Sequence, residues 1–244
     1  MHIRDFHSHE DRAQCVVLQE LIWGADFTEK VPAAMLLVAQ KLGGVAAGAF
    51  ADDGVLMGFV FGVTGLKDGR LVHWSDMLAV RPEAQGLHLG ERLKEYQRDQ
   101  CCRLGIETMY WTYDPLVARN AHLNLNRLGA RVDEYVVAMY GEGTNSPLQG
   151  DMPTDRFVVS WAIDPARAAP PLVSLPHGIP HGVPRVVVRI PRDIAALAAT
   201  DITTARRWRE VTRREFTHYL PLGYVVRGFV ADPSGGAYLL ELPA

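Results

Sequence analysis

The chain has 244 residues, of which 48% are hydrophobic and 22% are charged. Because this length and apolar content can bury one sizeable core or two small ones, the chain is predicted to be globular, and extended disorder is excluded. The formal net charge of -3 provides no bulk attraction to nucleic acid or to an anionic membrane, so a small molecule is the expected partner.

The cysteines indicate a reducing compartment, and the hydropathy indicates no membrane-spanning segment. Cys15, Cys101 and Cys102 form neither a CxxC pair nor an even set with disulfide spacing, so free thiols are expected. No window approaches the ~18 apolar residues that cross a bilayer, and no apolar segment follows Met1 directly. The prediction is a cytoplasmic protein with no membrane and no nucleic-acid partner.

The pattern over residues 8–80 predicts a helix followed by an antiparallel meander. Ser8 and Asp11 have the spacing of a capping box, and the helix is expected to end near residue 23. The apolar stretch 31–42 is ambiguous. Asp-Gly pairs favour hairpin turns, and they separate the strands predicted at 45–50, 55–63 and 71–80.

The next segment is predicted to form a crossover. A helical apolar face ends at Leu104 before Gly105, and the following strand, 108–113, should lie parallel to the strand 71–80. Further elements are a helix at about 117–128, strands at 132–140, 157–163 and 186–190, helices at about 192–199 and 201–219, and strands at 224–231 and 237–242.

Prolines divide the C-terminal part of the chain. Six of them lie between Asp164 and Pro184, where neither a continuous helix nor a central strand can form. The predicted organisation is a domain over 1–163, a Pro-rich linker over 164–185 and a small α+β subdomain over 186–244. His177 and His181 have HxxxH spacing, but Pro180 between them denies the helix that metal pairs use, so no metal site is predicted.

The segment from Val80 to Gly90 has the features of an anion site. A strand ends, a tight turn follows and a helix begins. Unpaired N–H groups at a helix start and the positive end of its dipole can hold a pyrophosphate, and glycines at Gly86 and Gly90 let phosphates approach the backbone.

Met77 to Gly90 resembles the pyrophosphate-binding turn of the GCN5-related N-acetyltransferase (GNAT) superfamily. In that signature Gln or Arg opens a six-residue turn, Gly is fourth, and Gly or Ala is sixth. Gln85 and Gly90 match it, whereas His88 occupies the fourth place. Asn120 to Gly129 is similar to the family's next helix with its Leu-Gly ending.

The resemblance covers roughly residues 2–163 and implies a mixed α/β sheet with the GNAT acyltransferase fold, followed here by a small C-terminal α+β extension. A branch with such an extension is the closest match, through Asp114-Pro115, Arg119-Asn120-Ala121-His122 and Thr154-Asp155-Arg156. The implied chemistry is acyl transfer from acyl-CoA, usually to an amine, without a metal or redox cofactor. The implied cofactor-binding residues at the strand end and turn are Leu78, Ala79, Val80, Gln85, Gly86, Leu87, His88, Leu89 and Gly90.

Attack on a thioester needs a neutral amine and therefore a base. The resemblance implies Asp76 as that base; alternatively, Asp76 only accepts hydrogen bonds from a neighbouring loop. His73, on the opposite face of the same strand, is a candidate for substrate contact or a satisfied structural residue. A backbone N–H near Leu78 or Ala79 is expected to stabilise the thioester oxygen as charge develops on it.

In the family, a tyrosine two residues before the Leu-Gly pair commonly acts as the general acid that protonates the leaving CoA thiolate. Here Asn126 occupies that position, and asparagine cannot act as a general acid. Tyr113 or water is expected to protonate the thiolate, unless the thiolate leaves unassisted. Asn120 and Asn124 are candidates for pantetheine amides, although Asn124 also fits a solvated surface role. Arg156 is a candidate for a substrate carboxylate, with a surface ion pair as the alternative.

The resulting function is an acyl-CoA-dependent N-acyltransferase that acts on a small amine, for example an amino acid, with acetyl-CoA or succinyl-CoA as donor. The alternative from another class is a catalytically silent domain that binds acyl-CoA as a sensor or scaffold, which Asn126 and His88 favour. Transfer onto a protein lysine or an aminoacyl-tRNA is a third hypothesis. A homodimer is compatible with the sequence.

Overall fold

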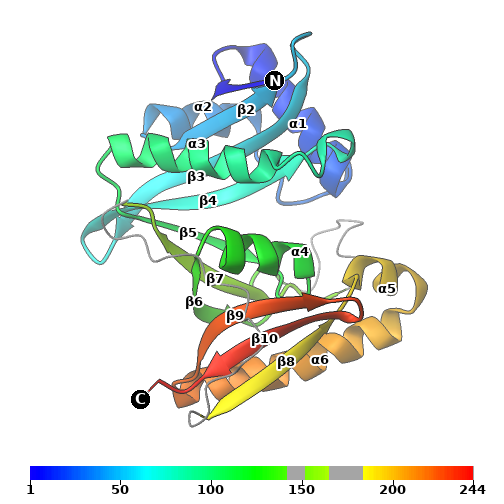
Figure 1. Ribbon diagram of the computed structural model, residues 1–244. Helices are drawn as coiled ribbons and strands as arrows, with labels where there is room; N and C mark the ends of the chain where they lie inside the picture. Colours follow the sequence, from blue (N-terminus) through cyan, green and yellow to red (C-terminus); the bar gives the residue numbers. More distant parts are fainter. Residues whose placement is uncertain (142–151, 165–183, 244) are drawn as a thin grey trace. The chain divides into compact units, whose positions relative to one another are not determined.

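The computed structural model describes residues 1–141, 152–164 and 184–243 (Figure 1). They form two compact units, the first from described residues 1–111 and 162–164, the second from 112–141, 152–161 and 184–243. These units differ from the domain division predicted at residue 163, which stays a prediction. Most of the predicted linker, with His177 and His181, lies outside the described residues.

The first unit contains most of a mixed sheet. Its elements are β1 (His2–Asp5), α1 (His9–Trp23), α2 (Ala33–Lys41), β2 (Val45–Phe50), β3 (Leu56–Lys67), β4 (Arg70–Val80), the 3-10 helix η1 (Pro82–Ala84), α3 (Leu89–Arg103) and β5 (Thr108–Tyr113). β1 to β4 pair antiparallel, and β4 pairs parallel with β5. The predicted helix, meander and parallel crossover are confirmed, and the ambiguous stretch 31–42 contains α2.

Helices cover both faces of this sheet (Figure 1). On one face, α1 and α2 pack against the strands through a buried cluster that includes Leu18, Leu36 and Phe59. On the other, α3 packs against β2, β3 and β4. The helix α1 begins with the predicted capping box, in which the Ser8 hydroxyl accepts from the Asp11 N–H at 3.0 Å and the Asp11 carboxylate accepts from the Ser8 N–H at 3.2 Å.

The second unit contains the end of β5, two further strands of the same sheet and a second sheet. Its elements are α4 (Ala118–Ala121), the π-helix η2 (His122–Arg127), β6 (Arg131–Val136), β7 (Arg156–Ala162), β8 (Arg185–Pro191), α5 (Ile194–Thr200), α6 (Ile202–Tyr219), η3 (Leu220–Leu222), β9 (Val225–Asp232) and β10 (Gly235–Glu241). The strand orders are β1-β2-β3-β4-β5-β7-β6 and β8-β10-β9. The predicted mixed-sheet fold with a C-terminal α+β extension is confirmed.

Aromatic rings form the core of the second unit. The ring of Phe157 on β7 lies 5.7 Å from that of Tyr113, 4.6 Å from that of Phe216 on α6 and 5.5 Å from that of Tyr238 on β10. The Tyr238 hydroxyl donates to the carbonyl of Pro115 at 2.7 Å. The C-terminal extension therefore shares its core with the end of β5 and with β7.

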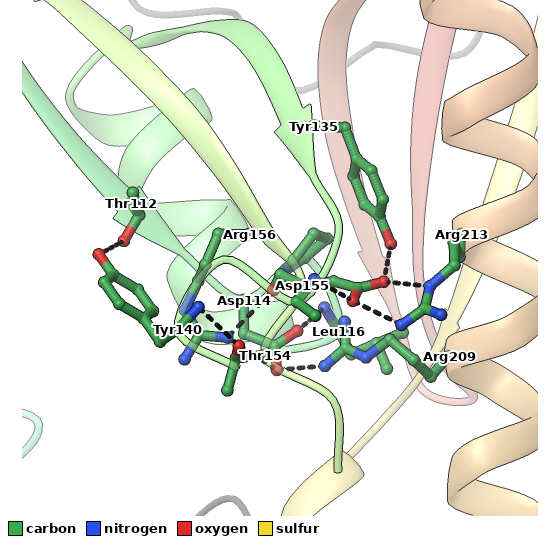
Figure 2. A network of polar contacts seen from close by, with 12 residues as sticks. Thr112, Asp114, Leu116, Tyr135, Tyr140, Thr154, Asp155, Arg156, Arg209 and Arg213 are labelled. Atoms are coloured by element: carbon green, nitrogen blue, oxygen red, sulfur yellow. Dashed lines mark hydrogen bonds and ion pairs between the residues drawn. The ribbon is translucent and has the colours of Figure 1, made fainter. Parts of the chain in front are cut away.

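Two carboxylates bind α6 to this core (Figure 2). Asp155 is fully buried and accepts hydrogen bonds from Arg213 at 2.8 and 2.7 Å and from the Tyr135 hydroxyl at 2.5 Å. Asp114 accepts from Arg209 at 2.5 Å, and only 1% of Arg209 is exposed. Both arginines belong to α6, so these charge-assisted bonds fix the helix to the residue that follows β5 and to the residue that precedes β7.

Over the described residues, no helix combines the length and the apolar character needed to cross a membrane.

Candidate functional site

A β-bulge at Asp76 interrupts the pairing of β4 with β3. Ser75 lies opposite Gly62 and Met77 lies opposite Phe61, so Asp76 is the extra residue without a partner on β3. A bulge of this kind bends the strand and resets the alternation of its side chains. Bulges are frequent next to active sites because they re-aim a side chain.

The side chains before and after the bulge show this reset. Before it, His73 and Ser75 bond to side chains of α3. After it, Met77 and Ala79 join the core beneath α1 and α2, on the opposite face. The strict alternation assumed from the sequence therefore does not hold along the whole of β4, because the extra residue shifts the strand by one position.

The Asp76 side chain reaches solvent at this bulge. Loss of part of its hydration to the surrounding protein raises the pKa of the Asp76 carboxyl, and the negative charge of Glu29 raises it further. A raised carboxyl pKa makes the carboxylate a stronger base. The position therefore suits proton transfer, and the role of Asp76 as base stays a prediction.

The turn after β4 has the backbone conformation of an anion site. Gly86 has φ +82° and open space where a Cβ would stand, so glycine is favoured there by conformation rather than by crowding. His88 precedes α3 with φ +55°, and its side chain makes no capping hydrogen bond. The first N–H groups of α3 thus have no cap from His88, and a pyrophosphate fits such a set of donors.

Gly90 allows α3 to approach β4. A Cβ at this position would lie 3.5 Å from the Leu78 side chain and 4.0 Å from that of Val80, which is ordinary van der Waals contact. Glycine or alanine therefore fits, whereas a larger side chain would push the helix away from the strand end. This agrees with the small residue expected at the sixth place of the turn.

Replacing His88 with glycine is expected to raise the free energy of unfolding by about 0.5–1 kcal/mol, because a left-handed backbone is strained for a residue with a Cβ. The imidazole is exposed and lies 3.5 Å from Glu91, so little packing is lost. Chemical denaturation measures the gain, and calorimetry should find CoA bound at least as tightly. Weaker CoA binding by His88→Gly would instead indicate that the imidazole itself contacts the ligand.

His73 is fully buried in the first unit. Its ring lies 3.1 Å from the Thr64 hydroxyl through Nδ1 and 3.0 Å from the Gln97 amide through Nε2. Burial and the charge of Lys94 lower the pKa of His73 to about 4, so the ring is neutral at physiological pH. These bonds fit the structural alternative, and the substrate contact stays a prediction.

Tyr113 and Asn126 lie in the second unit. Tyr113 is only 4% exposed, and burial raises the pKa of its phenol above the ordinary value, which makes it a weaker acid. The Asn126 amide donates to the carbonyl of Phe229 on β9 at 2.8 Å, so it joins η2 to the C-terminal sheet. The residue at the usual tyrosine position therefore has a structural contact, and Tyr113 as acid stays a prediction.

The other candidates in this unit lie on η2, α4 and β7. Asn120 is half-buried in α4, whereas Asn124 is only 5% exposed in η2. Asn120 thus belongs to a short α-helix and Asn124 to the π-helix that continues it. Arg156 begins β7, where its guanidinium donates to the carbonyl of Asp155 at 3.0 Å and lies 3.9 Å from Asp114. Their ligand roles stay predictions.

Sequence reasoning missed the contributions of Thr154 and Lys94. Thr154 is fully buried, accepts from the N–H of Tyr140 at 2.8 Å and donates to the carbonyl of Gly141 at 2.6 Å. Lys94 lies on the buried face of α3, where it bonds to Ser75 at 2.6 Å. In the sequence, a lysine among the apolar positions of a helix indicates a buried charge, so Lys94 could have been found. No sequence pattern indicates the hydrogen bonds of Thr154. Among the described residues, no group of His, Cys, Asp or Glu could hold a metal ion.

Known proteins resemble this chain in structure alone. No protein-family model matches it, and no curated protein matches it. An aminoglycoside 6'-N-acetyltransferase solved with coenzyme A is 15% identical, with a TM-score of 0.51 over 68% of this chain and 98% of that one. An acetyltransferase of the GNAT family from Streptococcus pneumoniae is 17% identical, with a TM-score of 0.51 over 67% and 99%.

The ribosomal-protein-S18-alanine N-acetyltransferase from Escherichia coli is 15% identical, with a TM-score of 0.50 over 73% of this chain and 98% of that one. Almost the whole length of each solved structure is thus matched by part of this chain. Together with the order of the strands and helices, these likenesses establish that the chain has the fold of the GNAT acetyltransferases.

Proposed function

We propose that the protein is an acyl-CoA-dependent N-acyltransferase that acts on a small amine. The observation that carries this proposal is the bulge at Asp76, an exposed carboxylate on the strand that leads into the turn before α3. Acetyl-CoA or succinyl-CoA is the proposed donor, and an amino acid is an example of the acceptor. The CoA-bound neighbour supports acyl-CoA as cosubstrate.

In this reaction the amine nitrogen attacks the thioester carbonyl carbon, so that a C–N bond forms and the C–S bond breaks. Asp76 takes the proton of the amine, directly or through water. A backbone N–H of Leu78 or Ala79 stabilises the oxygen on which negative charge develops. The first N–H groups of α3, with Gln85 to Gly90, hold the pyrophosphate.

Roles for residues of the second unit rest on the resemblance of the sequence. Asn120 and Asn124 are proposed to bond to the pantetheine amides, and Arg156 to a carboxylate of the substrate. Tyr113 or water returns a proton to the leaving thiolate. Because burial raises the pKa of Tyr113, water is the better donor of that proton.

The function is tested by measuring thiol release from acetyl-CoA and succinyl-CoA across a panel of amines that includes amino acids and their amides. Asp76→Asn is expected to lower kcat/KM about 100-fold, because it removes the base while keeping the side-chain shape. Asp99→Asn, which alters a surface carboxylate on α3, is the control and should match the wild type. Equal turnover by Asp76→Asn and the wild type would refute the assigned base.

A catalytically silent domain that binds acyl-CoA is the second candidate. The bond of Asn126 to the carbonyl of Phe229 favours it, because the position that usually carries the acid is engaged in a structural contact. Calorimetry with acetyl-CoA, succinyl-CoA and CoA distinguishes the candidates. Binding without turnover would support the silent domain, and absence of binding would contradict both.

A further inference from the structure

Lys94 is a buried lysine whose charge has no carboxylate partner. It lies on α3, is 4% exposed, and its ammonium donates to the Ser75 hydroxyl at 2.6 Å. The same Nζ lies 4.0 Å from the centre of the Trp111 ring. Among the described residues it forms no ion pair, so one hydroxyl and one aromatic face replace the water that an exposed ammonium would have.

A buried ammonium of this kind lowers the stability of the folded state. A buried charge without an opposite charge is destabilising, and a methionine would fill the same space without that cost. Burial lowers the pKa of Lys94 to about 7. Buried ionisable groups with no structural compensation are concentrated at functional sites. Lys94 therefore requires an explanation other than stability.

Other titratable groups near Lys94 do not neutralise it. His73 on β4 is neutral, and the Cys101 thiol on α3 remains protonated because burial raises its pKa to about 12. The residues of β2 include no titratable side chain, and on β3 the one titratable group, Lys67, contacts Tyr110 at the far end of the strand. Ser75 is therefore the main polar partner of Lys94.

Ser75 connects Lys94 to the proposed active site. It is the last residue paired with β3 before the bulge, and Asp76 follows it directly. A bulge leaves one residue unpaired, so the position of that residue depends on how its neighbours are held. Asp76 has no partner on β3. The hydrogen bond from Lys94 of α3 to Ser75 therefore holds the residue next to Asp76 in place.

We propose that Lys94 is a positioning residue, whose bond to Ser75 fixes the bulge in β4 and with it the carboxylate of Asp76 and the N–H groups of the strand end. This inference rests on the proposed acyltransferase function. The ammonium can only donate to the Ser75 oxygen, whereas the neutral amine can also accept the hydroxyl proton. Deprotonation of Lys94 therefore weakens the charge-assisted hold on the bulge.

The test compares the pH dependence of kcat in the wild type and in Lys94→Met, which keeps the length of the side chain and removes its charge. The wild-type kcat is expected to exceed that of Lys94→Met about 30-fold at pH 6 and only about threefold at pH 9, since the stronger bond exists below the Lys94 pKa. KM for acyl-CoA should differ by less than about twofold. Ser75→Ala should reproduce the loss of kcat and of the pH dependence.

Lys41→Met, which alters an exposed lysine at the end of α2, is the control and should match the wild type. A purely structural lysine predicts a different result, in which Lys94→Met loses folding stability and kcat together, by a ratio that does not change with pH. That result, or an unchanged kcat, would overturn the positioning role while leaving the acyltransferase function intact. Absence of turnover by the wild type would overturn the function and the positioning role together.

Discussion

Replacing Asp155 with alanine is expected to lower the free energy of unfolding of the second unit by about 3–5 kcal/mol. The carboxylate is fully buried and accepts two bonds from Arg213, one from Tyr135 and one from the N–H of Ala138. Its removal leaves these donors without an acceptor, and the attachment of α6 to β7 is lost. Chemical denaturation at pH 7 measures the change.

The control for this variant is Asp133→Asn, which removes a surface carboxylate of β6 that accepts from Ser160 at 2.8 Å and should change stability by less than about 0.5 kcal/mol. Burial raises the pKa of Asp155, but the bonds from Arg213 and Tyr135 outweigh it and hold the pKa below the ordinary value. The stabilisation is therefore complete above about pH 4 and disappears as the pH falls through the folded-state pKa. A loss below about 1 kcal/mol at pH 7 would contradict the role assigned to Asp155.

The contacts of the Asp155 carboxylate could not be predicted from the sequence. Thr154-Asp155-Arg156 resembles a segment of one branch of the superfamily. The partners of Asp155, however, are Arg213, about sixty residues away in sequence, and Tyr135 on another strand. Local patterns reveal periodicity, caps and turns, whereas an ion pair between distant elements has no local signal. The helical pattern of α6 likewise gives no sign that Arg209 is buried, although this arginine is only 1% exposed.

Local signals, by contrast, predicted most elements of the first unit. The capping box at Ser8 and Asp11 is formed, because both of its hydrogen bonds lie within one turn of chain. The turn before α3 also follows from its own residues, as glycine at Gly86 permits its positive φ. The bulge at Asp76 was not predicted, since it depends on the register between β4 and β3 rather than on the residues of β4 alone.

The bulge also changes how the candidate site is understood. Strict alternation along β4 would keep His73, Ser75 and Met77 on one face. The extra residue Asp76 instead leaves His73 and Ser75 on the face of α3 and places Met77 in the core beneath α1 and α2. Asp76 lies where the alternation of side chains along β4 is reset, and its side chain is exposed to solvent. A base located there is held by pairing on both sides, which restricts its position without covering its carboxylate.

Lys94→Met is expected to raise the free energy of unfolding by about 3 kcal/mol at pH 6, although it removes the hydrogen bond to Ser75. The pKa of Lys94 falls from 10.5 to about 7 on folding, so between these values the unfolded chain binds more protons than the folded one. Wild-type stability therefore rises with pH across this window, and the cost of burying the lysine is complete below pH 7 and absent above pH 10.5.

The variant has no lysine at this position, so its advantage should shrink steadily from pH 7 to pH 10 and vanish near the upper end of the window. Denaturation curves of both proteins at pH 6, 7, 8, 9 and 10 measure the difference, with Lys41→Met as the exposed control that shows none. A pH-independent difference would contradict the lowered pKa of Lys94. A variant that is more stable at pH 6 and slower in turnover would show that the fold retains Lys94 at a cost to its own stability, which a purely structural residue does not explain.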